Sequence, residues 1–269
     1  MNQYLVFLEK QVETQHNSIQ MYELANKKVW LKKASKRHSP WLYLPLRWLS
    51  HYFGLSMLSP IPNLGGKHAI ACELNRLHTL NQFGISVPRV LAQRPDSFLI
   101  ADAAQDDLMS MQLSSALKHQ PNSACRLKLF KIAIEALQNV HDQGQYLSEA
   151  FARNILLDGS NHICFVDFET DPGCVLSLHD CQIRDWLCFI FSTAVCFNQD
   201  EIDQVSFLLL HALKSQPDIC RAIHLVSQKF QWILKFKPER FGNDGIRMTK
   251  CIHLLNELGE HFEKERLLS

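Results

Sequence analysis

The most informative stretch of the chain spans residues 141–172 and reads HDQGQYLSEAFARNILLDGSNHICFVDFETDP. Two short apolar runs of β type, 155–157 and 163–166, flank a turn-forming Asp-Gly-Ser-Asn sequence, which predicts a β-hairpin. Asn154 precedes the first run and Asp167 follows the second. A hairpin would place this amide and this carboxylate on the same side, where they offer the hard oxygen ligands that Mg²⁺ bound to nucleotide phosphates needs.

This arrangement resembles the catalytic and metal-binding core of the protein-kinase-like phosphotransferases, in which an Asp, four residues, an Asn and a hairpin ending in Asp-Phe-Gly follow one another. Asn154 matches the metal-binding Asn, and Asp167-Phe168-Glu169 matches the metal-binding triplet. Within this superfamily, the chain most resembles the bacterial lipopolysaccharide-core sugar (heptose/Kdo) kinases, in which the triplet often ends in an acidic residue. The resemblance implies an α+β, protein-kinase-like two-lobed fold that uses ATP and Mg²⁺.

The chain departs from the family at the catalytic position. Glu149 stands five residues before Asn154, where the family places its catalytic Asp, and Leu147 replaces the usual His. Glu149 can still accept the proton of an attacking hydroxyl, but its extra methylene displaces the oxygens by roughly 1–1.5 Å. Misplacement on that scale can lower the rate about 100-fold. The sequence leaves open an active enzyme with Glu149 as base and a nucleotide-binding pseudokinase.

Arg153, next to Asn154, is the second candidate catalytic residue. The resemblance extends to the Ala-Ala-Arg-Asn loop of tyrosine kinases, which implies that Arg153 binds an anionic acceptor. The alternative is an ordinary ion pair with a nearby acid. Asp185, at the start of an apolar helical stretch, matches the family's Asp that accepts backbone N–H bonds from the catalytic loop. Its role would be structural.

A lysine on an apolar strand and a glutamate on the first helix should hold the nucleotide phosphates. The segment Val29-Trp30-Leu31-Lys32 has the form of that strand, and Glu73 is the acidic residue of the helical pattern at 66–83. We therefore expect Lys32 and Glu73 to be the cofactor-binding pair; the alternative is a set of solvated surface charges. Lys67, which follows two glycines at the start of the helix, is a competitor for Lys32.

The order of expected elements is that of a small strand-rich lobe followed by a helical one. Residues 1–101 should form the N-lobe and residues 102–269 the helical C-lobe with the catalytic loop and metal-binding hairpin. The region 13–20, where a phosphate-covering loop is expected, has no glycine. The expected strands are 19–25, 29–34, 87–91 and 97–101, and the clearest helices besides 66–83 are 127–141 and 183–197.

Composition sets further bounds. The net charge of +1 does not favour nucleic acid as a partner. Nine cysteines without a Cys-x-x-Cys pair indicate reduced thiols. The grouping Cys174, His179 and Cys181 has the residue types of a metal site, but such spacings are usually accidental. The chain shows no secretory signal or membrane-spanning run, so we expect a cytoplasmic protein.

Two segments combine aromatic and basic residues: the insert at 38–58 and the run KFQWILKFKPER at 229–240. Each is consistent with burial in the fold or with contact with a membrane or anionic glycolipid. The sequence therefore predicts a phosphotransferase that acts on a sugar hydroxyl of lipopolysaccharide core, or a related envelope glycoconjugate, as a peripheral protein at the inner face of the membrane. The alternatives are a regulatory pseudokinase scaffold and transfer of a nucleotidyl group.

Overall fold

The computed structural model describes residues 3–34, 57, 59, 61, 65–104 and 110–268. The protein is mixed α+β, with a small antiparallel sheet and a larger helical region. It divides into two compact units: unit 1 is Met1–Ser110 with Leu156–Leu176, and unit 2 is Met111–Ile155 with Ser177–Ser269. Most of the insert expected at 38–58 lies outside the described residues.

This division differs from a single boundary after residue 101, because the hairpin from Leu156 onward groups with unit 1. The backbone N–H of Phe165 donates to the carbonyl oxygen of Ser86 at 2.9 Å. A hydrogen bond of this kind attaches the hairpin to the segment before the strand β3 (Val90–Arg94). Asp167 therefore belongs to the same unit as Lys32 and Glu73.

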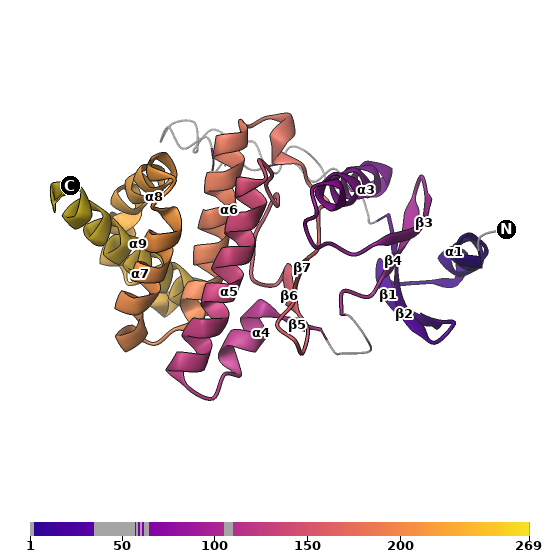
Figure 1. Ribbon diagram of the computed structural model, residues 1–269, viewed down its shortest axis with the longest axis horizontal. Coiled ribbons are helices and arrows are strands. Elements are labelled where there is room, and N and C mark those ends of the chain that lie inside the picture. The colour runs from indigo at the N-terminus through magenta and orange to yellow at the C-terminus, as the bar shows by residue number, and fades with distance from the viewer. Residues whose placement is uncertain are drawn as a thin grey trace. The chain divides into compact units, whose positions relative to one another are not determined.

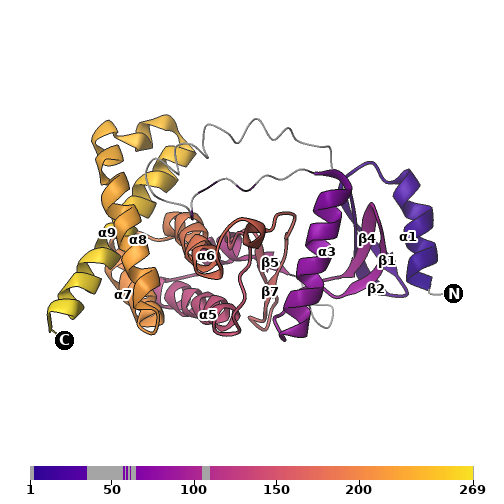
Figure 2. The ribbon, with the colours of Figure 1, turned by 90° about the horizontal axis from the view of Figure 1, so that it is seen from above.

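The core of unit 1 is a four-stranded antiparallel sheet of order β1-β2-β4-β3. The helices α1 and α3 lie on opposite faces of this sheet (Figures 1 and 2). The other elements are α1 (Gln3–Thr14), β1 (Ile19–Leu24), β2 (Lys27–Lys33), α3 (Gly66–Gln82) and β4 (Ser97–Ala101).

The sequence did not reveal α1. Its Leu8 is fully buried against Val29, Leu31 and Leu99 of the sheet. Residues 13–20 therefore connect α1 to β1 and do not form a loop between the first two strands. The actual β1–β2 turn is Ala25 and Asn26, both with positive φ (52° and 60°), as in the tight two-residue turns that suit the twist of a hairpin.

Strand β3 begins three residues later than expected. The sequence favoured 87–91, but Pro88 has no backbone N–H to give to a ladder, and the strand runs from Val90 to Arg94 with an irregularity between Val90 and Ala92. The strand at 97–101 agrees with expectation, and those expected at 19–25 and 29–34 are present as 19–24 and 27–33, so Lys27 and Lys28 belong to β2 and not to the turn. The helix α3 also agrees with expectation, and its end is followed by Gly84 at φ 72°, the left-handed position that favours glycine.

The expected hairpin is present as β6 (Ile155–Leu157) and β7 (Ile163–Phe165), which pair with one another. Its turn is held by Asp158, whose Oδ1 accepts from the Ser160 backbone N–H at 2.9 Å, the Ser160 hydroxyl at 2.6 Å and the His162 N–H at 3.0 Å. Asn161 takes the left-handed conformation (φ 63°) that such a turn requires. The carboxylate thereby fixes where β7 begins.

Unit 2 is built from helices. The expected helix at 127–141 lies within α5 (Ser123–Asp142). The helix expected at 183–197 begins earlier, as α6 (Leu178–Thr193), and is followed by the 3₁₀ helix η4 (Ala194–Cys196). Phe130 of α5 packs against Phe189 of α6, with ring centroids 5.3 Å apart. The elements of unit 2 other than Ile155 of β6 are β5 (Met111–Gln112), α4 (Leu113–Lys118), α5 (Ser123–Asp142), α6 (Leu178–Thr193), α7 (Ile202–Leu213), α8 (Pro217–Phe230), α9 (Asn243–Leu268) and the 3₁₀ helices η4 (Ala194–Cys196), η5 (Gln199–Glu201), η6 (Gln231–Phe236) and η7 (Pro238–Phe241); a further 3₁₀ helix, η3 (Pro172–Cys174), belongs to unit 1.

The nine cysteines are all free thiols, as the sequence indicated. Burial raises the pKa of Cys251 to about 12, so this thiol stays protonated at neutral pH. Across the described part of the chain, none of the helices combines the length and the apolar character that crossing a bilayer requires.

Candidate functional site

Lys32 lies at the centre of a cluster of charged side chains in unit 1. Its Nζ is 2.6 Å from Glu73 Oε2, 3.0 Å from Glu169 Oε1 and 3.2 Å from Asp167 Oδ1. The expected pair of Lys32 and Glu73 is therefore formed, and the Asp167-Phe168-Glu169 triplet contributes both of its acids. Three elements far apart in the sequence converge on one ammonium group.

Alternation along β2 explains the orientation of Lys32. Val29 and Leu31 pack into the core on the side of α1, so Trp30 and Lys32 point to the opposite face. Glu73 reaches Lys32 from α3, where it sits within a buried stripe at three- and four-residue spacing. The strand and the helix thus place a cation and an anion together without help from a loop.

The carboxylates of Asp167 and Glu169 come from the chain after β7. Phe168 between them is buried, so the two acids project to the side away from its ring. Asp167 has φ 72°, a conformation that non-glycine residues rarely adopt and that tends to persist at functional sites. This backbone turn directs its carboxylate toward Lys32.

Burial and charge set the protonation of the cluster. Burial disfavours the Lys32 ammonium, but the carboxylates of Glu73, Asp167 and Glu169 outweigh it and hold the pKa of Lys32 above its ordinary value. Burial raises the pKa of Glu73 to about 7; the Lys32 ammonium opposes this shift, and the neighbouring carboxylates add to it. Within this group of four side chains, one ammonium faces three acids.

The acids have the chemistry of a divalent-cation site. One oxygen from each of Glu73, Asp167 and Glu169 lies within 4.8 Å of the others. Asp167 and Glu169 are partly exposed, with 45% and 27% of their side chains accessible. Carboxylate oxygens that reach solvent are the ligands that Mg²⁺ prefers.

Lys67 does not compete for this position. It is exposed in the first turn of α3, whereas Lys32 is buried among the acids. Gly65, before the helix, has φ 62°, so its role is to let the chain turn into α3.

In unit 2, Asp185 of α6 anchors the segment before Glu149. Its fully buried Oδ2 accepts the backbone N–H of Leu147 at 2.6 Å and lies 3.3 Å from His141 Nε2. The expected contact between Asp185 and the backbone before Glu149 is thus present. A buried carboxylate bonded in this way fixes the loop where the usual His is absent.

His141 was not recognised from the sequence. Its ring packs edge-on against Trp186, with centroids 5.8 Å apart, and faces Asp185 from α5. The sequence shows that Asp185 and Trp186 are adjacent in an apolar helical stretch. No spacing rule, however, connects Asp185 to a His 44 residues earlier. Only the packing of α5 on α6 shows the relationship.

Glu149 is held by a partner that the sequence did not reveal. Arg184 Nη2 lies 3.1 Å from Glu149 Oε1, with Arg184 the more buried of the two. Ser148, just before it, has φ 74°. Arg153 does not supply this ion pair: its guanidinium lies over the ring of Phe151, 4.4 Å from the centroid. Glu149 is 30% exposed, so its carboxylate is both anchored and accessible.

Asn154 is buried and belongs to the same loop as Glu149. Its Nδ2 donates to the Glu149 carbonyl oxygen at 3.2 Å, and its backbone N–H donates to the carbonyl of Phe151 at 2.8 Å. This leaves the amide oxygen as the group suited to a metal. Asn154 lies in unit 2 and Asp167 in unit 1, so their action on one metal ion stays a prediction.

The Cys174, His179 and Cys181 grouping gains no support. Cys181 is fully buried in α6, whereas Cys174 and His179 are exposed. Among the described residues, two sets of three metal-ligating side chains come together: the Lys32 cluster acids and a second set, Asp203, Glu257 and His261.

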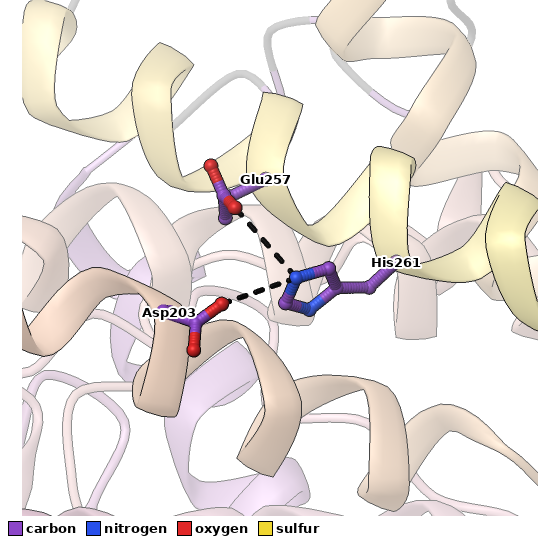
Figure 3. A group of neighbouring side chains, drawn as sticks. All are labelled: Asp203, Glu257 and His261. Atoms are coloured by element: carbon purple, nitrogen blue, oxygen red, sulfur yellow. Dashed lines mark ion pairs between the residues drawn. The ribbon is translucent and has the colours of Figure 1, made fainter.

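The second set joins α7 to α9 (Figure 3). His261 Nε2 lies 3.2 Å from Asp203 Oδ1 and 3.6 Å from Glu257 Oε1. The Ser206 hydroxyl donates to the Asp203 carbonyl oxygen at 2.7 Å and lies 3.2 Å from His261 Nδ1. The ring also packs on Phe207, with centroids 4.0 Å apart. The His261 ring thus lies between two carboxylates, and its contact with Asp203 links α9 to α7.

Unit 1 also has a cavity of about 320 Å³ that is separate from the Lys32 cluster. Its lining includes the cations Lys27, Lys28 and Arg89, together with Asp102. Asp102 accepts from Trp30 Nε1 at 2.8 Å and from the Ala104 backbone N–H at 2.9 Å. The cavity marks the turn end of β2, and the charged cluster lies toward the other end of that strand.

No protein-family model matches the chain, and the curated proteins contain no significant match to it.

Proposed function

We propose that the protein is an ATP- and Mg²⁺-dependent phosphotransferase with a protein-kinase-like, two-lobed fold. The observation that carries the proposal is the contact of Lys32 with both Glu73 and Asp167. This combination of strand lysine, helix glutamate and hairpin aspartate is the arrangement with which kinases hold nucleotide phosphates. The three residues were singled out from sequence alone, and within unit 1 they meet.

In the proposed mechanism, Lys32 binds the nucleotide phosphates and Glu73 holds its ammonium in place. Asn154 and Asp167 would hold Mg²⁺, with Glu169 at hand as a further acid. When bound, the metal supplies charge neutralisation at the phosphates. Because Asp167 is partly exposed, its carboxylate could leave the Lys32 ammonium and bind the metal ion instead.

Glu149 would serve as the base. It would accept the proton of the acceptor hydroxyl as the hydroxyl oxygen bonds to the γ-phosphorus and the bond to the β–γ bridging oxygen breaks, releasing ADP. Arg184 keeps the Glu149 carboxylate in position, which offsets the extra freedom of the longer side chain. Arg153 is free of Glu149 and remains the residue proposed to bind an anionic acceptor.

We propose a sugar hydroxyl of lipopolysaccharide core, or a related envelope glycoconjugate, as the acceptor, with the protein at the inner face of the membrane. This part depends on the similarity of the hairpin triplet to sugar kinases. The acidic Glu169, which contacts Lys32 at 3.0 Å, is the residue that carries it.

The second candidate function is that of a nucleotide-binding pseudokinase that acts as a regulatory scaffold. One observation favours it: Glu149 is already engaged by Arg184, so its carboxylate is not wholly available to a hydroxyl. In that case the Lys32 cluster would bind nucleotide without transfer.

One experiment separates these functions. The protein is incubated with Mg²⁺, purified lipopolysaccharide core and ATP labelled at either the γ- or the α-phosphate, and wild type is compared with Glu149→Ala. Incorporation of γ-label that Glu149→Ala abolishes supports phosphoryl transfer with Glu149 as base. Incorporation of α-label would show nucleotidyl transfer instead. Mg²⁺-dependent ATP binding without incorporation of either label would support the scaffold.

A further inference from the structure

Exposed aromatic side chains gather in the consecutive 3₁₀ helices η6 and η7 of unit 2. Trp232, Phe236 and Phe241 are 49%, 66% and 77% exposed, and η6 has no buried residue. Scattered apolar residues on a surface are ordinary, but three large aromatics within ten positions are not. Burial in the fold, one of the two interpretations of the 229–240 run, is wrong for Trp232 and Phe236.

The same ten positions are strongly basic. Lys235, Lys237 and Arg240 are exposed, as is Lys229 just before them. The acid within the segment, Glu239, accepts from the Thr249 hydroxyl at 3.2 Å. Exposed cations and exposed aromatic rings therefore occupy the same short segment, which favours a negatively charged partner.

The segment is a fixed platform and not a loose loop. Lys237 takes the left-handed conformation (φ 51°) where η6 meets η7. Pro238, which follows, is buried, and a Cβ built on Gly245 of α9 would lie only 1.8 Å from the Pro238 carbonyl oxygen. Because only glycine permits this approach, the backbone of η7 is seated on the first turn of α9.

Within η6, the rings of Trp232 and Phe236 pack edge-on against one another, with centroids 5.7 Å apart. Their exposure therefore results from a defined arrangement. A preformed surface of this kind loses little conformational entropy when it binds.

We propose that this surface, the basic aromatic platform formed by Lys229, Trp232, Lys235, Phe236, Lys237, Arg240 and Phe241, binds membranes that contain anionic lipid. Trp and Phe side chains partition to the headgroup region, and each Lys or Arg near an anionic leaflet adds to the attraction. A second copy of the chain is a poor partner, because the two cationic faces would repel one another.

The inference deepens the proposed function, because it names the surface by which the enzyme would reach a membrane glycolipid. In that respect it rests on the proposed function. Membrane binding itself, however, requires neither ATP nor transfer and can be measured separately.

The test is co-sedimentation of the full chain with vesicles of phosphatidylcholine alone or mixed with phosphatidylglycerol. We expect binding to the anionic vesicles only, weakening as salt is raised. The triple variant Trp232→Ala/Phe236→Ala/Phe241→Ala and the charge reversal Lys235→Glu/Lys237→Glu should each weaken binding by about tenfold or more. Exposed residues of unit 1 supply matched controls, Phe83→Ala and Lys27→Glu/Lys28→Glu, which should bind as wild type does.

Failure of the wild type to bind anionic vesicles would overturn the proposal, as would equal losses in platform and control variants. So would self-association in the absence of lipid that the triple aromatic variant abolishes. Circular dichroism confirms that each variant is folded. Transfer to a delipidated, water-soluble core acceptor is measured in parallel. If the wild type transfers phosphate but does not bind vesicles, the membrane-binding proposal alone is refuted. If the wild type and Lys32→Met both bind vesicles but the wild type transfers no phosphate, the proposed enzymatic activity alone is refuted.

Discussion

The ammonium of Lys32 and the carboxylate of Glu73 are 2.6 Å apart, and both side chains are almost wholly buried. A buried ion pair of this kind contributes little net stability, but removal of one partner leaves an uncompensated charge. We therefore expect Lys32→Met to lower the free energy of unfolding by about 3 kcal/mol. Lys28→Met, which changes an exposed lysine of the same strand, is the control. Urea denaturation measures both.

The double variant Lys32→Met/Glu73→Gln should recover most of this loss, because the carboxylate that Lys32 had compensated is then neutral. Full additivity of the two single effects would contradict the direct coupling of the pair.

The stability of the protein should depend on the protonation of Glu73. The pKa of Glu73 is about 7 in the folded protein, against 4.5 ordinarily, so between these values the folded state binds the proton more tightly than the unfolded state. Stability must then fall as pH rises through this window, by at most about 1.4 kcal/mol per pH unit. The unfolding free energy of the wild type, relative to that of Glu73→Gln, should decrease steadily from pH 4.5 to pH 8. If this relative stability stays constant or increases with pH, the pKa of Glu73 is not raised in the folded protein.

Loss of the Asp185 carboxylate should loosen the segment before Glu149. Asp185 accepts the Leu147 N–H in a fully buried setting, and hydrogen bonds to buried charges contribute about 1.5–3 kcal/mol. Asp185→Ala is expected to destabilise the protein by at least that amount and to expose the Leu147 amide to hydrogen exchange. Asp218→Ala, which removes an exposed acid paired with Arg221, should change stability by less than about 1 kcal/mol. An unchanged hydrogen-exchange rate of the Leu147 amide in Asp185→Ala would show that Asp185 does not anchor this segment.

Sequence reasoning located the hairpin, the strand of Lys32 and the helix of Glu73 because each has a local signature. The turn residues at 158–161 and the alternation of β2 operate within a few residues, and the structure agrees with them. The meeting of Lys32 with Glu73 was an expectation from family resemblance, and the contact at 2.6 Å bears it out.

What sequence reasoning missed depends on tertiary packing. The partner of Glu149 is Arg184, 35 positions away on a different element, and no periodicity connects the two. The helix α1 was missed because its buried face is narrow, with Leu8 as its fully buried residue. The platform at η6 and η7 was undecided for the same reason: its basic and aromatic pattern is the same whether the rings are buried or exposed.

Arg184 should act as a positioning residue for Glu149. If Glu149 is the base, Glu149→Ala is expected to lower transfer about 10²–10⁴-fold, and Arg184→Ala about tenfold, with less effect on the KM for ATP. Arg184→Lys, which retains the charge, should recover part of the loss. Rates and KM values from labelled-phosphate transfer supply the measurement. Faster transfer by Arg184→Ala would mean instead that the ion pair restrains Glu149 from acting.

The most direct test of the account is Mg²⁺-dependent binding of ATP, measured by isothermal titration calorimetry on the full chain. Asp167 and Lys32 are proposed to hold the metal and the phosphates, and they touch at 3.2 Å. We predict that ATP binds in the presence of Mg²⁺, that chelation of the metal weakens binding, and that Asp167→Asn weakens it at least about tenfold. Asp96→Asn, which alters a half-exposed acid of the same unit, should leave it unchanged. ATP binding that is absent, or that is indifferent to both Mg²⁺ and Asp167, would contradict the account.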